Sequence, residues 1–376
     1  MRIIVVDVPA DQGGALSILH QFHQYVMEQG KQHEWVFMVS TPELEQAEHV
    51  RVIRYPWIRK SLLHRLFWDY VCAASFIKKI KADAVLSLQN MPVPRSGVPN
   101  IVYIHQALPF QTSKNYSFAR RDERGMAFYQ HIIGRLIKSG IRRAHLSIVQ
   151  SEWMKQAILN NVSISSERIQ VIKPDVQIPD SYRSSQRAGE SIQTNRFFYP
   201  AAAVPYKNHQ CIIRAASILY DKGWHNFSVE LTITEQDGPL AQALFLASNT
   251  RYPIKFLGKM SQTEVYERLT DAILLFPSYI ETVGLPLLEA RAIGSMILAS
   301  DTPFSRDNLK DYPNVRFFDP LDPQTLADEM ERILTGQQQY AAVPFVEEEP
   351  APSTGWESIV SRVVQGVNRL NNERGH

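Results

Sequence analysis

Apolar and polar positions along this chain alternate in blocks of two lengths. Short apolar runs, such as 3–8, interrupted only by Asp7, and 273–276, are typical of strands buried on both faces of a sheet. Longer stretches with helical spacing, such as 285–293, separate them. Strands alternating with helices predict parallel sheets built from right-handed crossovers.

The same pattern gives an expected set of elements for each half of the chain. In the first half we expect strands at 3–8, 35–39, 50–54, 84–88, 100–104 and 146–149, and helices at 15–29, 61–81, 123–139 and 151–159. In the second half we expect strands at 196–199, 228–232, 254–256, 273–276, 296–299 and 315–318, and helices at 208–220, 239–247, 262–269, 285–293 and 323–334.

A polar, Ser-rich stretch at 179–195 reads as a linker, which predicts an α/β chain of two domains. We place a first Rossmann-like domain at 1–178, a second at 196–352 and a closing helix at 353–376. Ligands of doubly wound sheets bind beyond the carboxyl ends of the strands, so a cleft between the domains is the expected site.

Composition narrows the class of protein. The 376 residues are 44% hydrophobic and 21% charged, which excludes a disordered or fibrous chain. Cys72 and Cys211 are the only cysteines, so neither a disulfide framework nor a Cys-rich metal site is expected. There is no run of about 18 apolar residues, and the first apolar run breaks at Asp7, unlike a signal peptide. We therefore expect a cytoplasmic protein.

The net charge of +2 hides a difference between the halves. Residues 1–172 hold 21 Lys and Arg against 13 Asp and Glu, a net charge of +8, and the rest hold 19 against 25, a net charge of −6. Nucleic acid and an anionic membrane surface are both candidate partners of a basic half. Because no nucleic-acid-binding motif is present, we favour the membrane.

The segment 274–290 carries the strongest chemical signal. An apolar run ends at Phe276, a loop carries Glu281, and Gly284 allows a close approach of backbone to a ligand. Pro286 suits a first helical turn, so the new helix would point free N–H groups at an anion such as a phosphate. Glu289 lies on the first turns of that helix, where it could accept hydrogen bonds from ribose hydroxyls, and Glu281 could accept them from a second polyol.

In this segment the chain resembles the retaining glycosyltransferases of the GT-B fold, family 4 or group 1. Their mark is two Glu separated by seven residues with a Gly after the first, as in Glu281-Thr-Val-Gly284-Leu-Pro-Leu-Leu-Glu289. Further similar segments occur at 148–155, 171–176, 297–303 and 317–320, and the resemblance spans about 146–335. It implies that Glu281 contacts the donor sugar, that Glu289 holds the ribose, and that the C-terminal helix crosses back to the first domain. It also implies donor contacts along Thr282, Val283, Gly284 and Leu285.

The resemblance also implies a pair of cations for the donor pyrophosphate. Lys207 fits the Lys position, but Ala202 stands where the family has Arg. A missing cation removes part of the stabilisation of the leaving diphosphate, so Lys259, or less directly Arg291, would have to compensate. A Lys at the start of a helix is also a common solvated cap, which is the alternative for Lys207.

Two signals fall in the first half. His105 follows an expected strand, and the resemblance implies that a His in this position binds the transferred sugar. A buried structural His is the alternative. Gly13 and Gly14 resemble the family's glycine loop near donor phosphates and acceptor, although two glycines also simply make a turn. Of these, Gly14 is assigned to the donor and Gly13 to the acceptor.

A basic, aromatic stretch at 57–68 includes Arg59, Lys60 and Arg65, which we assign to an acceptor or membrane side. A core-packed helix with a basic outer face is the alternative.

These observations predict a retaining hexosyltransferase that needs no metal or other cofactor, because no Asp-x-Asp occurs in the chain. The donor would be a nucleoside diphosphate sugar, with a UDP-sugar as the first candidate. The acceptor would be a glycan or lipid-linked glycan in bacterial surface polysaccharide synthesis. We expect the protein in the cytoplasm, peripherally at the inner face of the membrane, and without nucleic acid. Two alternatives stay open: a non-catalytic nucleotide-sugar or glycan-binding partner, suggested by Ala202, and a nucleotide-sugar epimerase.

Overall fold

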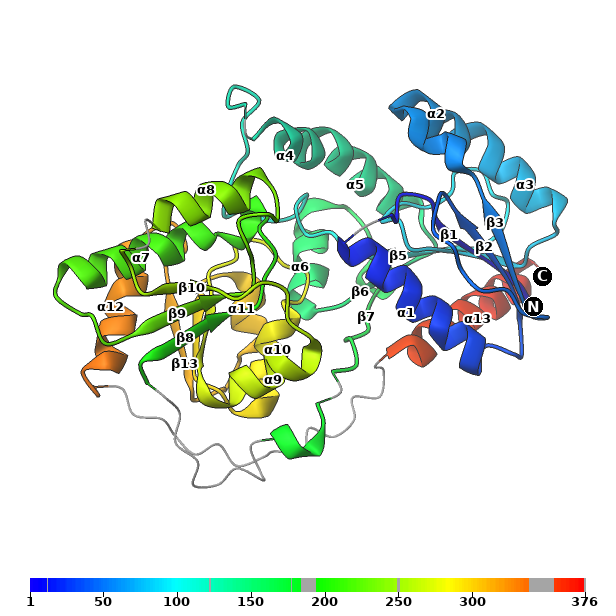
Figure 1. The fold of residues 1–376 in the computed structure, drawn as a ribbon. Coiled ribbons are helices and arrows are strands. Elements are labelled where there is room, and N and C mark those ends of the chain that lie inside the picture. The colour runs from blue at the N-terminus through cyan, green and yellow to red at the C-terminus, as the bar shows by residue number, and fades with distance from the viewer. Residues whose placement is uncertain are drawn as a thin grey trace. The chain divides into compact units, whose positions relative to one another are not determined.

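The computed structural model describes residues 1–11, 13–121, 123–176, 178–183, 194–248, 251–337 and 355–374. The chain divides into two compact units (Figure 1). One comprises Met1–Asp175 with Pro350–His376, and the other comprises Val176–Glu349. Most of the expected linker, residues 184–193, lies outside the described residues.

The first unit is built on a parallel sheet of seven strands in the order β3-β2-β1-β4-β5-β6-β7. The strands are β1 (Arg2–Asp7), β2 (Glu34–Val39), β3 (Val50–Arg54), β4 (Ala84–Ser87), β5 (Asn100–Ile104), β6 (Leu146–Val149) and β7 (Ile169–Val171). The helices are α1 (Gly13–Gln29), α2 (Leu62–Phe67), α3 (Ala73–Lys79), α4 (Arg124–Phe128), α5 (Gly134–Arg143), α6 (Glu152–Asn161) and α13 (Gly355–Arg374). Six strands were expected here, and the short β7 is an addition.

Side chains of β1 alternate between two cores, which is why residues 3–6 are apolar without a break. Ile3 and Val5 pack with α1 and α13, whereas Ile4 and Val6 pack with α3 and the turn before it. Figure 1 shows α2 and α3 on the opposite side of this sheet from α13. A strand buried on both faces fixes its register strongly, because a slip by one residue would exchange the two cores.

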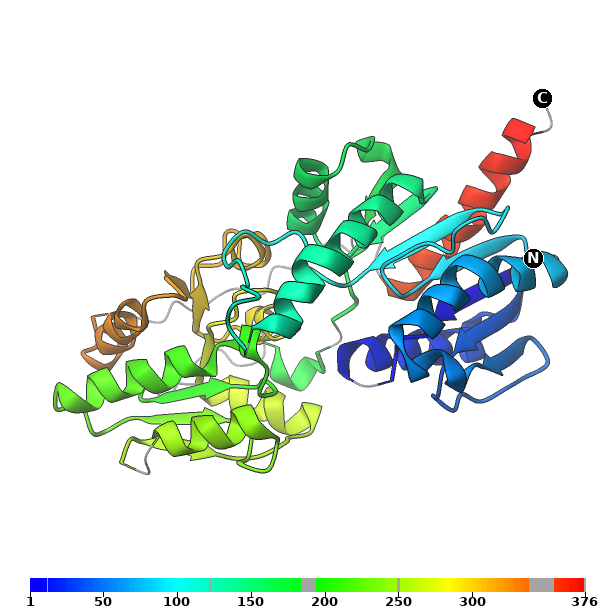
Figure 2. The same cartoon turned by 90° about the horizontal axis from the view of Figure 1, so that it is seen from above.

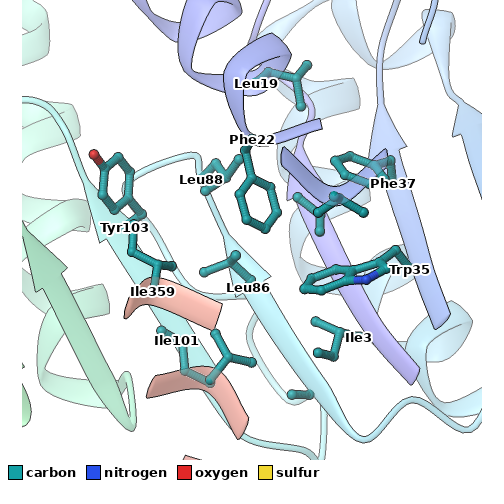
Figure 3. Packing of buried hydrophobic residues seen from close by; sticks show 14 of the residues in the cluster. Ile3, Leu19, Phe22, Trp35, Phe37, Leu86, Leu88, Ile101, Tyr103 and Ile359 are labelled. Carbon is teal, nitrogen blue, oxygen red and sulfur yellow. The ribbon is translucent and has the colours of Figure 1, made fainter. Parts of the chain in front are cut away.

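The C-terminal helix α13 belongs to the first unit, as expected. It buries Ile359, Val363 and Val367 in the core around Phe22 and Trp35 (Figure 3). Figure 2 shows α13 in red beside the cyan strands that include β4. Each such buried side chain contributes roughly 1.5–3 kcal/mol, so α13 is an integral layer of this unit.

The expected helix at 61–81 is interrupted. A π-helical turn at Trp68–Cys72 separates α2 from α3, and a second one at Tyr129–Ile133 separates α4 from α5. A π-helical turn inserts one residue, which shifts the side chains that follow around the helix axis. Hydrophobic periodicity alone does not distinguish such a turn from a continuous α-helix.

The second unit has a parallel sheet of six strands in the order β10-β9-β8-β11-β12-β13. The strands are β8 (Arg196–Tyr199), β9 (Ser228–Leu231), β10 (Ile254–Phe256), β11 (Ile273–Phe276), β12 (Ile297–Ser300) and β13 (Val315–Phe318). The helices are α7 (His209–Asp221), α8 (Pro239–Ser248), α9 (Gln262–Asp271), α10 (Leu285–Ile293), α11 (Pro303–Asn308) and α12 (Pro323–Leu334). Only α11 was not expected. The two parallel α/β sheets confirm the predicted fold class.

Candidate functional site

The second unit brings Lys207 and Glu281 together. Lys207 lies in the loop after β8 and Glu281 in the loop after β11, and these strands are neighbours in the sheet. The Lys207 Nζ is 2.5 Å from the Glu281 Oε1, and the side chains are 18% and 14% exposed. Two charges that were 74 positions apart in sequence thus form one ion pair at the carboxyl edge. A solvated helix cap, the alternative for Lys207, does not describe this contact.

A network behind the ion pair holds its backbone in place. The Tyr199 hydroxyl donates to the Lys207 carbonyl at 2.9 Å. Asn208, with φ of 56°, donates its side-chain amide to the Pro277 carbonyl at 3.2 Å and accepts from the Tyr279 hydroxyl at 2.8 Å. The left-handed conformation suits Asn better than most residues. The loops after β8 and β11 are therefore joined by side-chain hydrogen bonds below the charged groups.

Helix α10 begins beside this pair with a free end. Gly284 precedes it with φ of 80°, and a Cβ atom there would lie 3.2 Å from the Phe276 ring. Both facts explain why the position is a glycine. No side chain among the described residues caps the helix, whose first residue Leu285 is 44% exposed. The Leu287 N–H donates to the Gly284 carbonyl at 2.9 Å, and Pro286 has no N–H, so what the N-terminus offers an anion is chiefly its partial positive charge.

The residues between Glu281 and Gly284 are held from the side of α11. The Val283 carbonyl accepts from the Asn308 amide, and the Val283 side chain is buried. Thr282 is partly exposed. Of the expected donor contacts in this loop, Thr282 and Leu285 are thus the more accessible, and Val283 offers backbone.

Glu289 lies one turn into α10 and is nearly buried. Its Oε1 accepts a hydrogen bond of 2.6 Å from the Gln262 side chain, the first residue of α9. Burial raises the pKa of the Glu289 carboxyl, and the bond from Gln262 partly offsets this. Gln262 was not expected in the site. In the sequence, the only indication of this role was that Gln262 begins a helix that follows β10.

The cations expected to compensate for Ala202 differ in their surroundings. Ala202 is exposed and offers only a methyl group. Arg291 donates to the carbonyls of Asn308 at 2.8 Å and Lys310 at 3.2 Å, so it braces the end of α11. Lys259 is exposed in the loop after β10, three residues before Gln262. Lys259 therefore remains available to a ligand at this edge.

His105 occupies the carboxyl edge of the first sheet, directly after β5. Its Nε2 lies 2.7 Å from the Leu88 carbonyl, and its backbone N–H donates to the Asn90 side chain at 2.8 Å. Burial lowers the pKa of the imidazole. A neutral ring with the proton on Nε2 fits the carbonyl contact. The neighbouring turn therefore fixes His105 firmly in place.

A buried group of charges lies at the same edge and was not expected as such. Asp7 ends β1, is fully buried, and its carboxylate oxygens have no hydrogen-bond donor among the described residues. Burial raises the Asp7 pKa to about 8, and Arg65 lowers it in part. The Arg65 guanidinium donates to Asp69 at 2.6 Å and to Gln89 at 2.7 Å. The one available signal was an acidic residue closing an apolar run.

The other residues assigned to the first half separate into two groups. Gly13 and Gly14 open α1 instead of forming a loop before it, and a Cβ on Gly14 would meet open space. Arg59 forms an ion pair with Asp11, and Lys60 is exposed. Arg65 differs from them, because its side chain is 18% exposed and is paired inside the unit.

The described residues hold neither a cluster of metal ligands nor a membrane-spanning helix. Within those ranges no three His, Cys, Asp or Glu side chains gather as a metal site would need. The helices among them also fall short of the length and apolar character that a membrane span requires.

Comparison with known families finds two family models that lie end to end on this chain. The model described as Glycosyltransferase Family 4 matches residues 12–176, and the model described as Glycosyl transferases group 1 matches residues 183–343. The boundary between the matches falls close to the boundary between the two structural units.

Curated relatives share a modest identity with parts of the chain. The serotype-specific mannosyltransferase WbdA of Escherichia coli is 25% identical over 218 residues, which is 56% of this chain and 24% of that protein. The O-antigen chain mannosyltransferase RfbU of Salmonella typhimurium is 25% identical over 179 residues, 47% of this chain and 48% of that protein. The matches thus span about a quarter and about half of these relatives.

Solved structures share the fold over nearly the whole chain. A glycosyltransferase from Rickettsia africae matches with a TM-score of 0.62 at 15% identity, covering 99% of this chain and 97% of the other. HepE of Anabaena, solved with UDP and glucose, matches with a TM-score of 0.62 at 16% identity, covering 100% and 99%. WaaG, a glycosyltransferase of lipopolysaccharide biosynthesis, matches with a TM-score of 0.57 at 17% identity, covering 91% and 97%.

Proposed function

This chain belongs to the group 1 glycosyltransferases, and from that premise we propose that it is a retaining hexosyltransferase of bacterial surface polysaccharide synthesis. The donor is a nucleoside diphosphate sugar, with a UDP-sugar as the first candidate. The acceptor is a hydroxyl group of a glycan. If the reaction takes place at the membrane, that glycan is attached to a lipid.

The observation that carries the proposal is the ion pair of Lys207 and Glu281 in front of the α10 N-terminus. The pair offers a cation for phosphate and a carboxylate for sugar hydroxyls within one site. The partial positive charge of the helix end would attract a second phosphate oxygen. Glu289, further along the same helix, is placed to accept from ribose hydroxyls.

In the reaction we propose, the bond between the sugar C1 and the diphosphate oxygen breaks, and the diphosphate leaves with the electron pair. The acceptor hydroxyl oxygen forms its bond to C1 on the same face, which retains the configuration. The acceptor proton passes to the leaving phosphate. Lys207 and the α10 N-terminus stabilise the negative charge of the diphosphate, so the proposal does not include a metal ion.

Charge at this site explains why Lys207 and Glu281 are paired before a donor arrives. Leaving either charge partly buried and alone would cost free energy, and the pair avoids that cost in the empty site. A bound diphosphate then gives Lys207 a second anion, while Glu281 turns to the sugar. Lys259 is our candidate for the second cation that Ala202 does not supply.

The comparisons support the setting of the proposal. WbdA and RfbU are named as mannosyltransferases of serotype and O-antigen chains, and WaaG acts in lipopolysaccharide biosynthesis. HepE was solved with UDP and with UDP-glucose. A cytoplasmic enzyme working at the inner face of the membrane would meet both nucleotide sugars and lipid-linked acceptors.

A non-catalytic partner is the second candidate, and the exposed methyl of Ala202 favours it. Such a protein would bind a nucleotide sugar and leave it intact. A nucleotide-sugar epimerase, the third candidate, would convert the donor when no acceptor is present.

One experiment separates the three. The chain is incubated with UDP-, GDP-, ADP- and TDP-sugars, with and without glycan acceptors, and proton NMR follows the anomeric signals. We expect release or transfer of an α-configured sugar from one α-linked donor without added metal. Intact donor throughout would favour the binding partner, and an altered nucleotide sugar without acceptor would favour the epimerase.

A further inference from the structure

The first unit contains a pocket away from the candidate site. It has a volume of about 360 Å³ and lies between α5, the segment that leads into β5, and the π-helical turn before α3. Asn100, the first residue of β5, and His145, just before β6, line it. The pocket is therefore at the edge where these strands begin, whereas His105 follows the end of β5.

Hydrogen bonds from a buried side chain hold the wall of this pocket in place. The buried Asn100 side chain accepts from the Val93 N–H at 3.0 Å and donates to the Ser96 hydroxyl at 2.6 Å. Between these two contacts Arg95 has φ of 58°, in the left-handed region that an Arg seldom adopts. Backbone strain held in place by a buried network is typical of functional positions.

Cations surround the pocket. Arg95 and Arg143 line it, and the Lys78 Cε lies 3.6 Å from where a Cβ on the lining Gly97 would be. His145 accepts from the Asn100 N–H through Nδ1, so its Nε2 carries a proton. Among the described residues that line the pocket, none is acidic. An anion is therefore the matching ligand.

The segments of sequence around the pocket are also positively charged. The bordering segments 56–82, 91–100 and 124–149 hold six, one and five Lys or Arg residues. Asp69 is the single acidic residue in the three segments, and it is buried against Arg65. The three segments therefore carry a net charge of +11, although Arg59 is paired with Asp11 and Arg65 with Asp69.

An apolar ridge adjoins the pocket. We define it as Leu63, Phe67, Tyr70 and Val71, which are 76%, 53%, 44% and 52% exposed. Tyr70 belongs to the ridge and also lines the pocket. Large apolar side chains beside uncompensated cations are the combination by which peripheral proteins enter the interface of an anionic membrane.

We propose that this pocket binds the phosphate of an anionic phospholipid headgroup while the apolar ridge inserts between the acyl chains. Arg95 and Arg143 would hold the phosphate oxygens, and Tyr70 would lie at the level of the headgroups, where aromatic side chains with a polar end are favoured. Free DNA or RNA explains the charge but leaves the exposed Leu63 and Phe67 unexplained. This pocket would be the site at which the proposed glycosyltransferase contacts the membrane. The binding itself does not depend on the proposed function; only its biological role does.

Vesicle sedimentation tests the proposal without any donor or turnover. The full chain is mixed with vesicles of phosphatidylcholine alone or with 30% phosphatidylglycerol. We expect binding to the anionic vesicles only. The double variant Arg95→Ala with Arg143→Ala should bind about 30-fold more weakly, the loss expected for two cations near a charged surface. Lys31→Ala with Arg214→Ala removes the same charge elsewhere and should bind within about twofold of the wild type.

Two further variants separate a pocket from diffuse charge. Leu136→Trp fills the pocket from α5 without changing net charge and should weaken binding about tenfold, since the phosphate would be excluded. Leu63→Ser with Phe67→Ser, on the ridge, should weaken binding and leave the remainder highly sensitive to salt. Circular dichroism and donor release check that each variant is folded.

Several results would overturn the proposal. One is an equal loss in the Lys31 and Arg214 control. Another is unchanged binding in Leu136→Trp. A third is binding of free glycerol phosphate with no preference for anionic vesicles, which would indicate a small-molecule site. Binding to double-stranded DNA that is lost in the same variants would indicate nucleic acid. Because vesicle binding needs no sugar donor, failure here and failure of the glycosyltransferase proposal are distinguishable.

Discussion

The carboxyl edges of the two sheets each carry one ion pair, and they differ in what lies beside it. In the second unit, Lys207 and Glu281 form a partly exposed ion pair beside an open helix end. In the first unit, Asp7 is fully buried and Arg65 is tied to Asp69 and Gln89. The two ion pairs are equally shielded, at 18% and 14% exposed for Lys207 and Glu281 and 18% and 12% for Arg65 and Asp69, so the edges differ in the open helix end of one and the fully buried Asp7 of the other.

This difference indicates which sheet edge is suited to bind the nucleotide-sugar donor. A diphosphate needs a cation and a positive helix end, which the second unit offers in the loops after the neighbouring strands β8 and β11. In the first unit, Arg65 instead braces Gln89, whose chain neighbours Leu88 and Asn90 hold His105. We therefore expect substitutions in the second unit to change chemistry, and substitutions in the first to change stability first.

The largest expected effect comes from removing the carboxylate of the exposed pair. Glu281→Gln should lower turnover about 100- to 1,000-fold, because it removes one charged contact to the reacting sugar and keeps the shape. It should also lower the melting temperature slightly, because Lys207 loses its charged partner. Donor turnover is the measurement. Glu235→Gln, an exposed position in the loop after β9, is the matched control and should be as active as the wild type. Full activity in Glu281→Gln would contradict the role of this pair.

The second prediction concerns the buried Asp7 and the pH. Its pKa is about 8 in the folded protein against an ordinary 3.8, so between these pH values the folded protein holds a proton that the unfolded chain has lost. The cost of burying Asp7 therefore grows as pH rises through that window and levels off above pH 8 or so. Asp7→Asn should stabilise the protein more at pH 8 than at pH 5, by about 3–4 kcal/mol.

Denaturant unfolding at the two pH values measures this difference. Asp221→Asn, in an exposed ion pair of the second unit, should show almost no change between them. If Asp7→Asn gave the same small effect at both pH values, Asp7 would be ionised in the folded protein and the contrast between the edges would be wrong.

The third prediction tests whether Arg65 serves the fold or the membrane. Arg65→Ala leaves Asp69 and Asp7 buried without their cation and should reduce the free energy of unfolding by about 2–3 kcal/mol. Vesicle binding, measured below the melting temperature, should stay close to that of the wild type. If the Arg65→Ala variant were as stable as the wild type but no longer bound vesicles, Arg65 would contact the membrane instead of supporting the fold.

The smallest expected effect sharpens the role of the α10 N-terminus. Gly284→Ala forces a left-handed conformation on an L residue and brings a Cβ to 3.2 Å from Phe276. We expect a loss of about 1–2 kcal/mol in unfolding free energy, together with weaker donor binding. Gly223→Ala also has a positive φ but open space, and it should lose stability without any effect on the donor.

The same contrast explains what could be predicted from the sequence. Glu281, Gly284 and Glu289 lie in one contiguous segment, so they were identified together, and the family resemblance assigned Lys207 to the same site. The cluster of the first unit draws on β1, α2 and the turn after β4, three segments whose meeting depends on tertiary structure. Asp7 is unremarkable in sequence, and its role follows only from burial.

Two further differences arose from local geometry. The π-helical turn at Trp68–Cys72 is invisible to a hydrophobic period, yet it lies where Tyr70 and Val71 become exposed. Arg65 and Arg59 looked alike in a basic stretch, but Arg65 is directed inward to Asp69. A charge count along the chain does not say which side of a helix a residue is on.

The central claim is that the second unit holds the donor with its own cations, and calorimetry tests it most directly. UDP-, GDP-, ADP- and TDP-sugars are titrated without metal into the wild type, Lys207→Ala and Glu289→Ala. We predict that one nucleotide sugar binds the wild type and that both variants bind it at least tenfold more weakly. If no nucleotide sugar bound the wild type, or if both variants bound it equally well, the chain would share the family's fold without its donor site.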